Sequence, residues 1–199
     1  MKNIPFYDYE RMYQTEELYV SEVINDVLRR SDFILRDDLS KFEIGMAAYL
    51  DAKYAIGVGN GTDAIWLALL VAGVKPGDEV ILPVYTYCAS ANVILHTGAT
   101  PVFVDINAAD FNLAMEKVAE KITAKTKVIM PVDLGGLPCD YAALYELIEQ
   151  KKDLFKAASP QQEKLGRILL AADAAHSFGA MYQGKRVGSI ADITVFSFH

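Results

Sequence analysis

The chain has 199 residues, of which 52% are hydrophobic, and its formal net charge is −7 at pH 7. That much apolar sequence excludes a disordered chain, and the acidic balance argues against a surface for nucleic acid or anionic membrane. The longest apolar stretch, residues 64–74, is too short to span a bilayer. The N-terminus lacks a signal-peptide pattern, and Cys88 and Cys139 lie far apart. We therefore expect a cytoplasmic protein with no membrane or nucleic-acid partner.

Helical and strand patterns alternate along the chain. The N-terminal segment, residues 1–30, is predicted to be helical from Glu16 to Arg30, with an apolar face. The elements predicted next are, in order, helix 38–49, strand 54–58, helix 63–72, strand 79–82, helix 89–97, strand 101–104, helix 115–122, strand 127–132, helix 141–151, and strands 168–172 and 193–196. A polar interval, residues 152–166, is predicted to be a surface connection. Such alternation with short connections predicts an α/β fold, a mostly parallel sheet flanked by helices, over residues 31–199.

A glycine-rich turn, Gly59-Asn60-Gly61-Thr62-Asp63, precedes the predicted helix 63–72. Glycine lets the backbone approach a ligand closely, and the free N–H groups at the start of a helix attract phosphate. The turn matches neither the dinucleotide fingerprint nor a Walker loop, because no lysine follows it. Thr62 is therefore either a phosphate ligand or a simple N-cap of the helix.

Aromatic and polar side chains follow three of the other predicted strands. Tyr87 comes after strand 79–82 and could stack on a planar ligand or pack in the core. Asp173 and His176 follow strand 168–172, and Ser197 follows strand 193–196. Ligands of open α/β sheets bind outside the carboxyl ends of the strands, so we expect these side chains to line a ligand site. His176 alone could instead be a structural, hydrogen-bonded histidine, and no metal site is expected.

Six motifs occur in the order that characterises one enzyme family. They are Gly61-Thr62-Asp63-Ala64, residues 77–83, Thr86-Tyr87, residues 98–105, Asp173-Ala174-Ala175-His176 and Phe196-Ser197-Phe198-His199. With this order and spacing, the chain from about Ser31 onward resembles the DegT/DnrJ/EryC1/StrS family of sugar aminotransferases, which depend on pyridoxal 5′-phosphate (PLP). The resemblance implies an incomplete large domain of the type I, aspartate aminotransferase-like fold, without its small C-terminal domain.

The resemblance also implies a role for each candidate residue. Asp173 would pair with the pyridine nitrogen of PLP, and His176 would lie beside its ring hydroxyl, as the catalytic pair of this chain. Tyr87 would stack on the cofactor ring. The turn Gly61-Thr62-Asp63 and the hydroxyl of Ser197 would bind the cofactor phosphate.

What the resemblance implies about function concerns a longer protein. In relatives that read Ser-Phe-His-x-x-Lys, the Schiff-base lysine stands three residues beyond the position of His199, so this chain would be the N-terminal half of an enzyme and inactive alone. The full-length protein would be a cytoplasmic homodimer in polysaccharide biosynthesis. It would transfer an amino group, from glutamate as donor, to a keto group of a nucleotide-linked deoxysugar. Two alternatives stay open: a sugar dehydratase of the same fold, and a non-catalytic binding or regulatory domain.

Overall fold

The computed structural model describes residues 4–199, so the first three residues of the predicted N-terminal segment lie outside it. The chain divides into two compact units, Met1–Gly45 and Met46–His199. None of the helices within residues 4–199 is long and apolar enough to cross a membrane.

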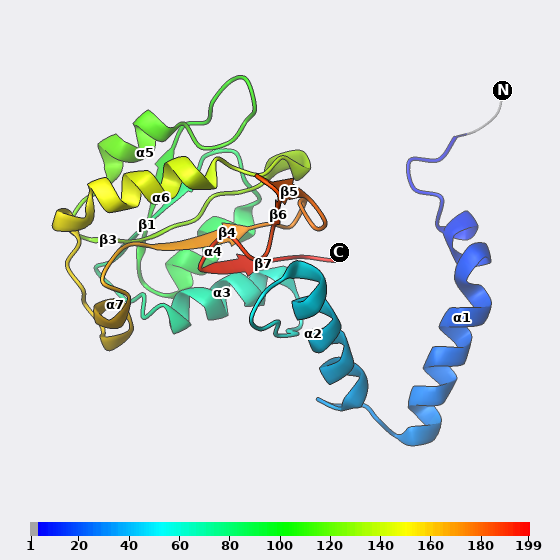
Figure 1. Ribbon diagram of the computed structural model, residues 1–199. Helices are drawn as coiled ribbons and strands as arrows, with labels where there is room; N and C mark the ends of the chain where they lie inside the picture. The colour runs from blue at the N-terminus through cyan, green and yellow to red at the C-terminus, as the bar shows by residue number, and fades with distance from the viewer. Residues whose placement is uncertain (1–3) are drawn as a thin grey trace. The chain divides into compact units, whose positions relative to one another are not determined.

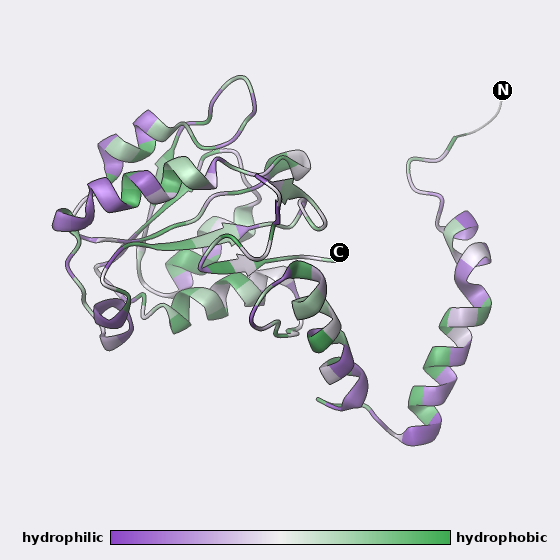
Figure 2. Ribbon diagram, viewed as in Figure 1, coloured by the Kyte–Doolittle hydropathy of each residue, from purple (hydrophilic) through white to green (hydrophobic). Residues whose placement is uncertain are grey.

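The first unit contains helix α1 (Tyr9–Arg30) and the beginning of helix α2 (Asp37–Leu50) (Figure 1). Helix α1 begins earlier than the predicted Glu16, because the Asp8 side chain accepts the Arg11 N–H at 3.0 Å and caps the helix there. It ends at Ser31, whose left-handed backbone closes the last turn. Hydrophobic and hydrophilic residues alternate along α1 in Figure 2, and none of its residues is buried. Its predicted apolar face is therefore uncovered.

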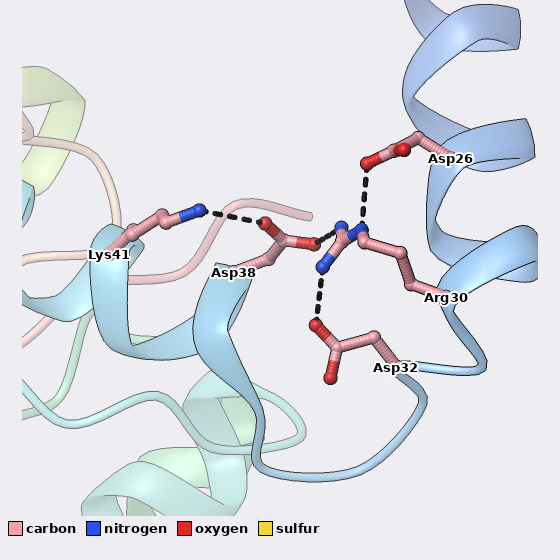
Figure 3. Close-up of polar contacts among 5 residues, drawn as sticks. All are labelled: Asp26, Arg30, Asp32, Asp38 and Lys41. Atoms are coloured by element: carbon pink, nitrogen blue, oxygen red, sulfur yellow. Dashed lines mark hydrogen bonds and ion pairs between the residues drawn. The ribbon is translucent and has the colours of Figure 1, made fainter.

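A charged cluster joins the end of α1 to the start of α2 (Figure 3). The Arg30 guanidinium donates to Asp26 at 2.8 Å, to Asp32 at 2.6 Å and to Asp38 at 2.5 Å. Lys41 lies 3.9 Å from the other oxygen of Asp38. The hydrogen bonds to Asp38 and Asp26 raise the pKa of Arg30 above its ordinary value. Ion pairs exposed to solvent contribute little free energy of folding. We therefore expect this exposed cluster to set the geometry of the turn between the helices and to add little to the stability of the fold.

The second unit is built on a parallel sheet with strand order β2-β1-β3-β4-β7. Its strands are β1 (Glu79–Pro83), β2 (Thr100–Val104), β3 (Thr126–Ile129), β4 (Leu169–Asp173) and β7 (Ile193–Val195). The predicted α/β class with a parallel sheet is confirmed. The sequence did not predict the short antiparallel ribbon of β5 (Met181–Tyr182) and β6 (Lys185–Arg186), which lies in the connection from β4 to β7.

Helices cover both faces of the sheet (Figure 1). Helices α3 (Gly61–Val71) and α4 (Cys88–His96) pack on one face, and α5 (Met115–Lys121) and α6 (Tyr141–Gln150) on the other. Strand β1 shows why both faces are apolar: Val80 and Leu82 join the core under α3 and α4, and Ile81 joins the core under α5 and α6. Successive side chains of a strand point to opposite faces, so a buried parallel strand must be apolar throughout.

One expectation is corrected by the structure. The predicted strand 54–58 is wrong, because these residues have an irregular backbone and are largely exposed. The helix predicted at 63–72 is present as α3, which buries Ile65, Ala68 and Leu69 and leaves Trp66 and Leu70 exposed. The polar interval 152–166 is the connection between α6 and β4, and it contains two short helices, the 3₁₀ turn η2 (Lys152–Leu154) and α7 (Pro160–Leu165). The other predicted elements are present, with shifted ends.

Candidate functional site

The candidate residues follow strands that are neighbours in the sheet. Tyr87 comes after β1, Asp173 is the last residue of β4, His176 comes after β4, and Ser197 comes after β7. Strands β1, β3, β4 and β7 are adjacent in that order and run parallel, so their carboxyl ends open at one edge of the sheet. This is the edge at which open α/β sheets bind ligands.

Asp173 is the buried carboxylate of this edge, with 7% of its surface exposed. The Ser90 hydroxyl, in the first turn of α4, donates to Asp173 Oδ2 at 3.0 Å, and the Ala175 N–H donates more weakly to Oδ1 at 3.3 Å. The Thr86 hydroxyl lies 3.0 Å from the Ser90 hydroxyl. The carboxylate is therefore held by hydroxyls that follow β1, a strand two places away in the sheet.

Opposing effects act on the ionisation of Asp173. Burial is the largest and raises the pKa of the carboxyl above its ordinary value. The hydrogen bonds from Ser90 and Ala175 and the nearby His176 lower it, whereas the neighbouring Asp133 carboxylate raises it. A buried carboxylate in this position gains most from a cationic partner, because the opposite charge replaces the lost solvation.

His176 presents an exposed imidazole next to a glycine turn. The Gly135 N–H, in the 3₁₀ turn η1 (Leu134–Gly136) that follows β3, donates to His176 Nδ1 at 3.2 Å. Because Nδ1 accepts this bond, the proton of the neutral ring is on Nε2. The histidine therefore has one structural hydrogen bond and an Nε2–H available to a ligand.

The glycine turn at the start of α3 lies against the end of the chain. A Cβ added at Gly61 would lie 3.0 Å from Ser197 Cβ and 3.3 Å from its hydroxyl oxygen, so glycine is what allows this approach. The alternative that Thr62 is the N-cap is wrong, since Asn60 caps α3 and accepts the Asp63 N–H at 2.9 Å. The Asn60 side-chain amide also donates to the Asp63 carboxylate at 2.9 Å. The amides of Gly61 and Thr62 begin the helix and have no partner in a preceding turn.

Tyr87 lies directly before α4 and is 76% exposed, so the alternative that it packs in the core is wrong. Three residues further along, Ser90 contacts Asp173, which places Tyr87 at the same end of the sheet as the buried carboxylate. Its ring is uncovered and can accept a flat ligand.

Sequence reasoning missed two residues of this edge, Ser90 and Asp133. Both are buried, and both are bonded to segments distant in the chain: Ser90 to Asp173, and Asp133 to Ser177. The sequence held one signal for each of them. Ser90 is a serine within an apolar helix, and Asp133 is an aspartate that follows a buried strand.

The geometry above agrees with the comparison with known proteins. The sequence pattern of the DegT/DnrJ/EryC1/StrS aminotransferase family matches residues 15–199. The chain belongs to this family. The resemblance predicted from the motifs is thereby confirmed.

Three relatives show how much of a family member the chain represents. It is 39% identical over 196 residues to the "Pleiotropic regulatory protein" of Geobacillus stearothermophilus, covering 98% of this chain and 49% of the relative. It is 38% identical over 200 residues to the GDP-perosamine synthase of Escherichia coli O157:H7, covering 100% of this chain and 49% of the relative. Spr1654 of Streptococcus pneumoniae, assigned as a sugar aminotransferase and solved in a PLP form, superposes with a TM-score of 0.91 at 40% identity. That alignment covers 100% of this chain and 49% of Spr1654.

The chain therefore spans about half the length of the family members it matches. Its fold is the corresponding half of a sugar aminotransferase, which confirms the predicted incomplete domain. Within residues 4–199, no group of three or more His, Cys, Asp or Glu side chains is placed to hold a metal ion.

Proposed function

We propose that the full-length protein containing these residues is a PLP-dependent aminotransferase. It transfers an amino group, from glutamate as donor, to a keto group of a nucleotide-linked deoxysugar. Membership of the family and the relatives named for a GDP-linked product and for sugar amino transfer support this proposal. The observation that carries it is Asp173, a buried carboxylate at a strand end beside an uncovered aromatic ring and a helix start. In this proposal residues 31–199 form the cofactor-binding domain and residues 1–30 a separate helical segment.

The residues of the site fit PLP. When bound, the cofactor supplies an electron sink for breaking the bond next to the transferred amino group. Asp173 would hold a proton on the pyridine nitrogen through a charge-assisted hydrogen bond. The cationic ring would in turn lower the pKa of Asp173, which burial raises in the cofactor-free chain. His176 would donate its Nε2–H toward the ring hydroxyl, and Tyr87 would cover one face of the ring.

The start of α3 and the end of the chain would hold the phosphate. The hydroxyls of Thr62 and Ser197 and the first amides of the helix can donate to it, and the helix dipole favours a negative charge there. The close approach of Gly61 to Ser197 brings these donors together. The Asp63 amide would reach the phosphate only by sharing its hydrogen with Asn60.

The remaining parts of the enzyme are proposed to lie elsewhere in the protein. We place the lysine that binds the cofactor covalently just after His199, and the small domain beyond it. Residues 1–199 alone would then be inactive, because they lack the group that abstracts and returns the substrate proton. We further propose a cytoplasmic homodimer that acts in polysaccharide biosynthesis.

A second candidate function is regulatory rather than catalytic. One relative, 39% identical, is named a pleiotropic regulatory protein, which favours a domain that keeps the fold to bind a ligand or a partner. The buried Asp173 and the uncovered Tyr87 argue against a purely structural role, which requires neither, and activity separates a ligand-binding regulator from an enzyme.

Incubation of the full-length protein with PLP, ¹⁵N-labelled glutamate and a panel of nucleotide-linked keto-deoxysugars separates the candidates. Mass spectrometry of the sugar product should show ¹⁵N incorporation. A product that has lost water and gained no ¹⁵N would instead identify a dehydratase of the same fold. No cofactor absorbance and no product with any sugar would support the regulatory candidate and contradict amino transfer.

A further inference from the structure

A buried carboxylate, Asp133, lies beside the site and has no part in the function proposed above. It has no exposed surface, and it accepts three hydrogen bonds: from the Cys139 N–H at 2.9 Å, the Tyr141 hydroxyl at 2.8 Å and the Ser177 hydroxyl at 2.7 Å. Its own N–H donates to the Asp173 carbonyl at 3.1 Å. Burial raises the pKa of Asp133 above its ordinary value, and the hydrogen bonds from the three donors act against this effect.

These bonds hold two segments of the site side by side. One is the turn after β3, residues 133–136, and the other is the loop after β4, residues 173–177. The loop is joined to the turn at Asp133 through Asp173 and Ser177, and at Gly135 through His176 Nδ1. The approach is close, since a Cβ added at Gly136 would lie 3.1 Å from the His176 carbonyl oxygen.

We propose that Asp133 is a positioning residue for His176. By accepting the Ser177 hydroxyl, it fixes the loop so that His176 Nδ1 stays on the Gly135 N–H. The neutral imidazole then carries its proton on Nε2, the nitrogen that the proposed function directs toward the ring hydroxyl of PLP. This inference rests on the proposed function only for the identity of the ligand, because the bond that selects the tautomer is internal to the chain.

Two variants separate positioning from simple stability. Ser177→Ala removes the side-chain hydrogen bond from the His176 loop to Asp133 and leaves the backbone bond between Asp133 and Asp173 in place. Tyr141→Phe removes a hydroxyl from the same carboxylate oxygen, but Tyr141 belongs to the start of α6 and not to the loop that carries His176. The two side chains are each 1% exposed, so the variants are matched in burial and in the bond that is lost.

The measurements are the ¹⁵N NMR tautomer ratio of His176 in the cofactor-free full-length protein, the midpoint of unfolding and the dissociation constant of PLP. We expect both variants to lower the midpoint of unfolding. Only Ser177→Ala should reduce the ratio of Nε2–H to Nδ1–H tautomer, by about two- to tenfold, the range for one intramolecular hydrogen bond, and weaken PLP binding by a similar factor.

An unchanged tautomer ratio in Ser177→Ala, or an equal change in Tyr141→Phe, would overturn the positioning role. Failure of the unaltered protein to bind PLP would overturn the proposed function instead, and the tautomer ratio distinguishes the two results. Should Ser177→Ala fail to fold, Ser177→Cys keeps a weaker donor at the same position. It should then give a smaller reduction in the ratio, and an unchanged ratio in that variant would also count against the proposal.

Discussion

Removing the Ser90 hydroxyl should raise the pKa of Asp173 and destabilise the protein at neutral pH. Ser90 donates to a carboxylate that is 7% exposed, over 3.0 Å, so water cannot readily replace the lost bond. A hydrogen bond to a charged group contributes about 1.5–3 kcal/mol. Since one pKa unit corresponds to about 1.4 kcal/mol, Ser90→Ala should raise the pKa of Asp173 by about one to two units.

The sign of the pH dependence follows from the direction of this shift. Burial already holds the folded-state pKa of Asp173 above its ordinary value, so ionisation of this group costs stability as the pH rises through the folded-state pKa. Ser90→Ala raises that pKa further. The difference in unfolding free energy between the unaltered protein and Ser90→Ala should therefore reach its full size above the folded-state pKa of Asp173 in the variant. It should shrink below the folded-state pKa of Asp173 in the unaltered protein, because the carboxyl is then protonated in both proteins.

Denaturant unfolding of the cofactor-free full-length protein and of Ser90→Ala, from about pH 4 to about pH 8, measures this difference. Thr97→Val is the matched control. Thr97 follows the other end of α4, is 9% exposed, and donates its hydroxyl to the Ile94 carbonyl at 2.7 Å rather than to a carboxylate. Its loss of stability should not vary with pH through this range. A Ser90→Ala effect that is equally independent of pH would refute the coupling of Ser90 to Asp173.

Three further predictions concern the site of the full-length protein. Asp173→Asn should retain PLP, seen by absorbance, but lose nearly all amino transfer, and full activity in this variant would contradict its role at the pyridine nitrogen. Ser197→Ala should weaken PLP binding by about 1–3 kcal/mol, measured by equilibrium titration, and unchanged affinity would exclude its hydroxyl from the phosphate site. Gly61→Ala should also weaken PLP binding, because the new methyl would meet Ser197 at 3.0 Å. Gly45→Ala in α2, where an added Cβ has no neighbour within 4 Å, is its control, and equal affinity in both variants would argue against a tight approach at Gly61.

The sheet could be predicted from the sequence where strands are buried on both faces. Residues 80–82 and 168–172 are apolar runs because their side chains pack in the cores under the two helical layers. The same logic failed at residues 54–58, since a short apolar pattern does not by itself distinguish a strand from an irregular segment. The cap of α3 was also missed, because Asn60 and Thr62 are both good N-cap residues and only the backbone geometry distinguishes them.

Only those residues of the candidate site that stand close to strand ends were predicted from the sequence. Asp173 and Ser197 follow apolar runs directly and His176 stands three residues after Asp173, so their position at the sheet edge needed no knowledge of distant contacts. Ser90 and Asp133 act through partners 83 and 44 residues away. Such pairings depend on the order of the strands, and alternation of helices and strands does not specify that order.

The central claim is that PLP lies at the edge formed by β1, β4, β7 and the start of α3. A crystal structure of the full-length protein with PLP tests it most directly. We expect the pyridine nitrogen within about 3 Å of the Asp173 carboxylate, with the phosphate bonded to Ser197 and the first turn of α3. A cofactor bound elsewhere, or an Asp173 carboxylate that still has only Ser90 and the Ala175 amide as partners, would contradict the account.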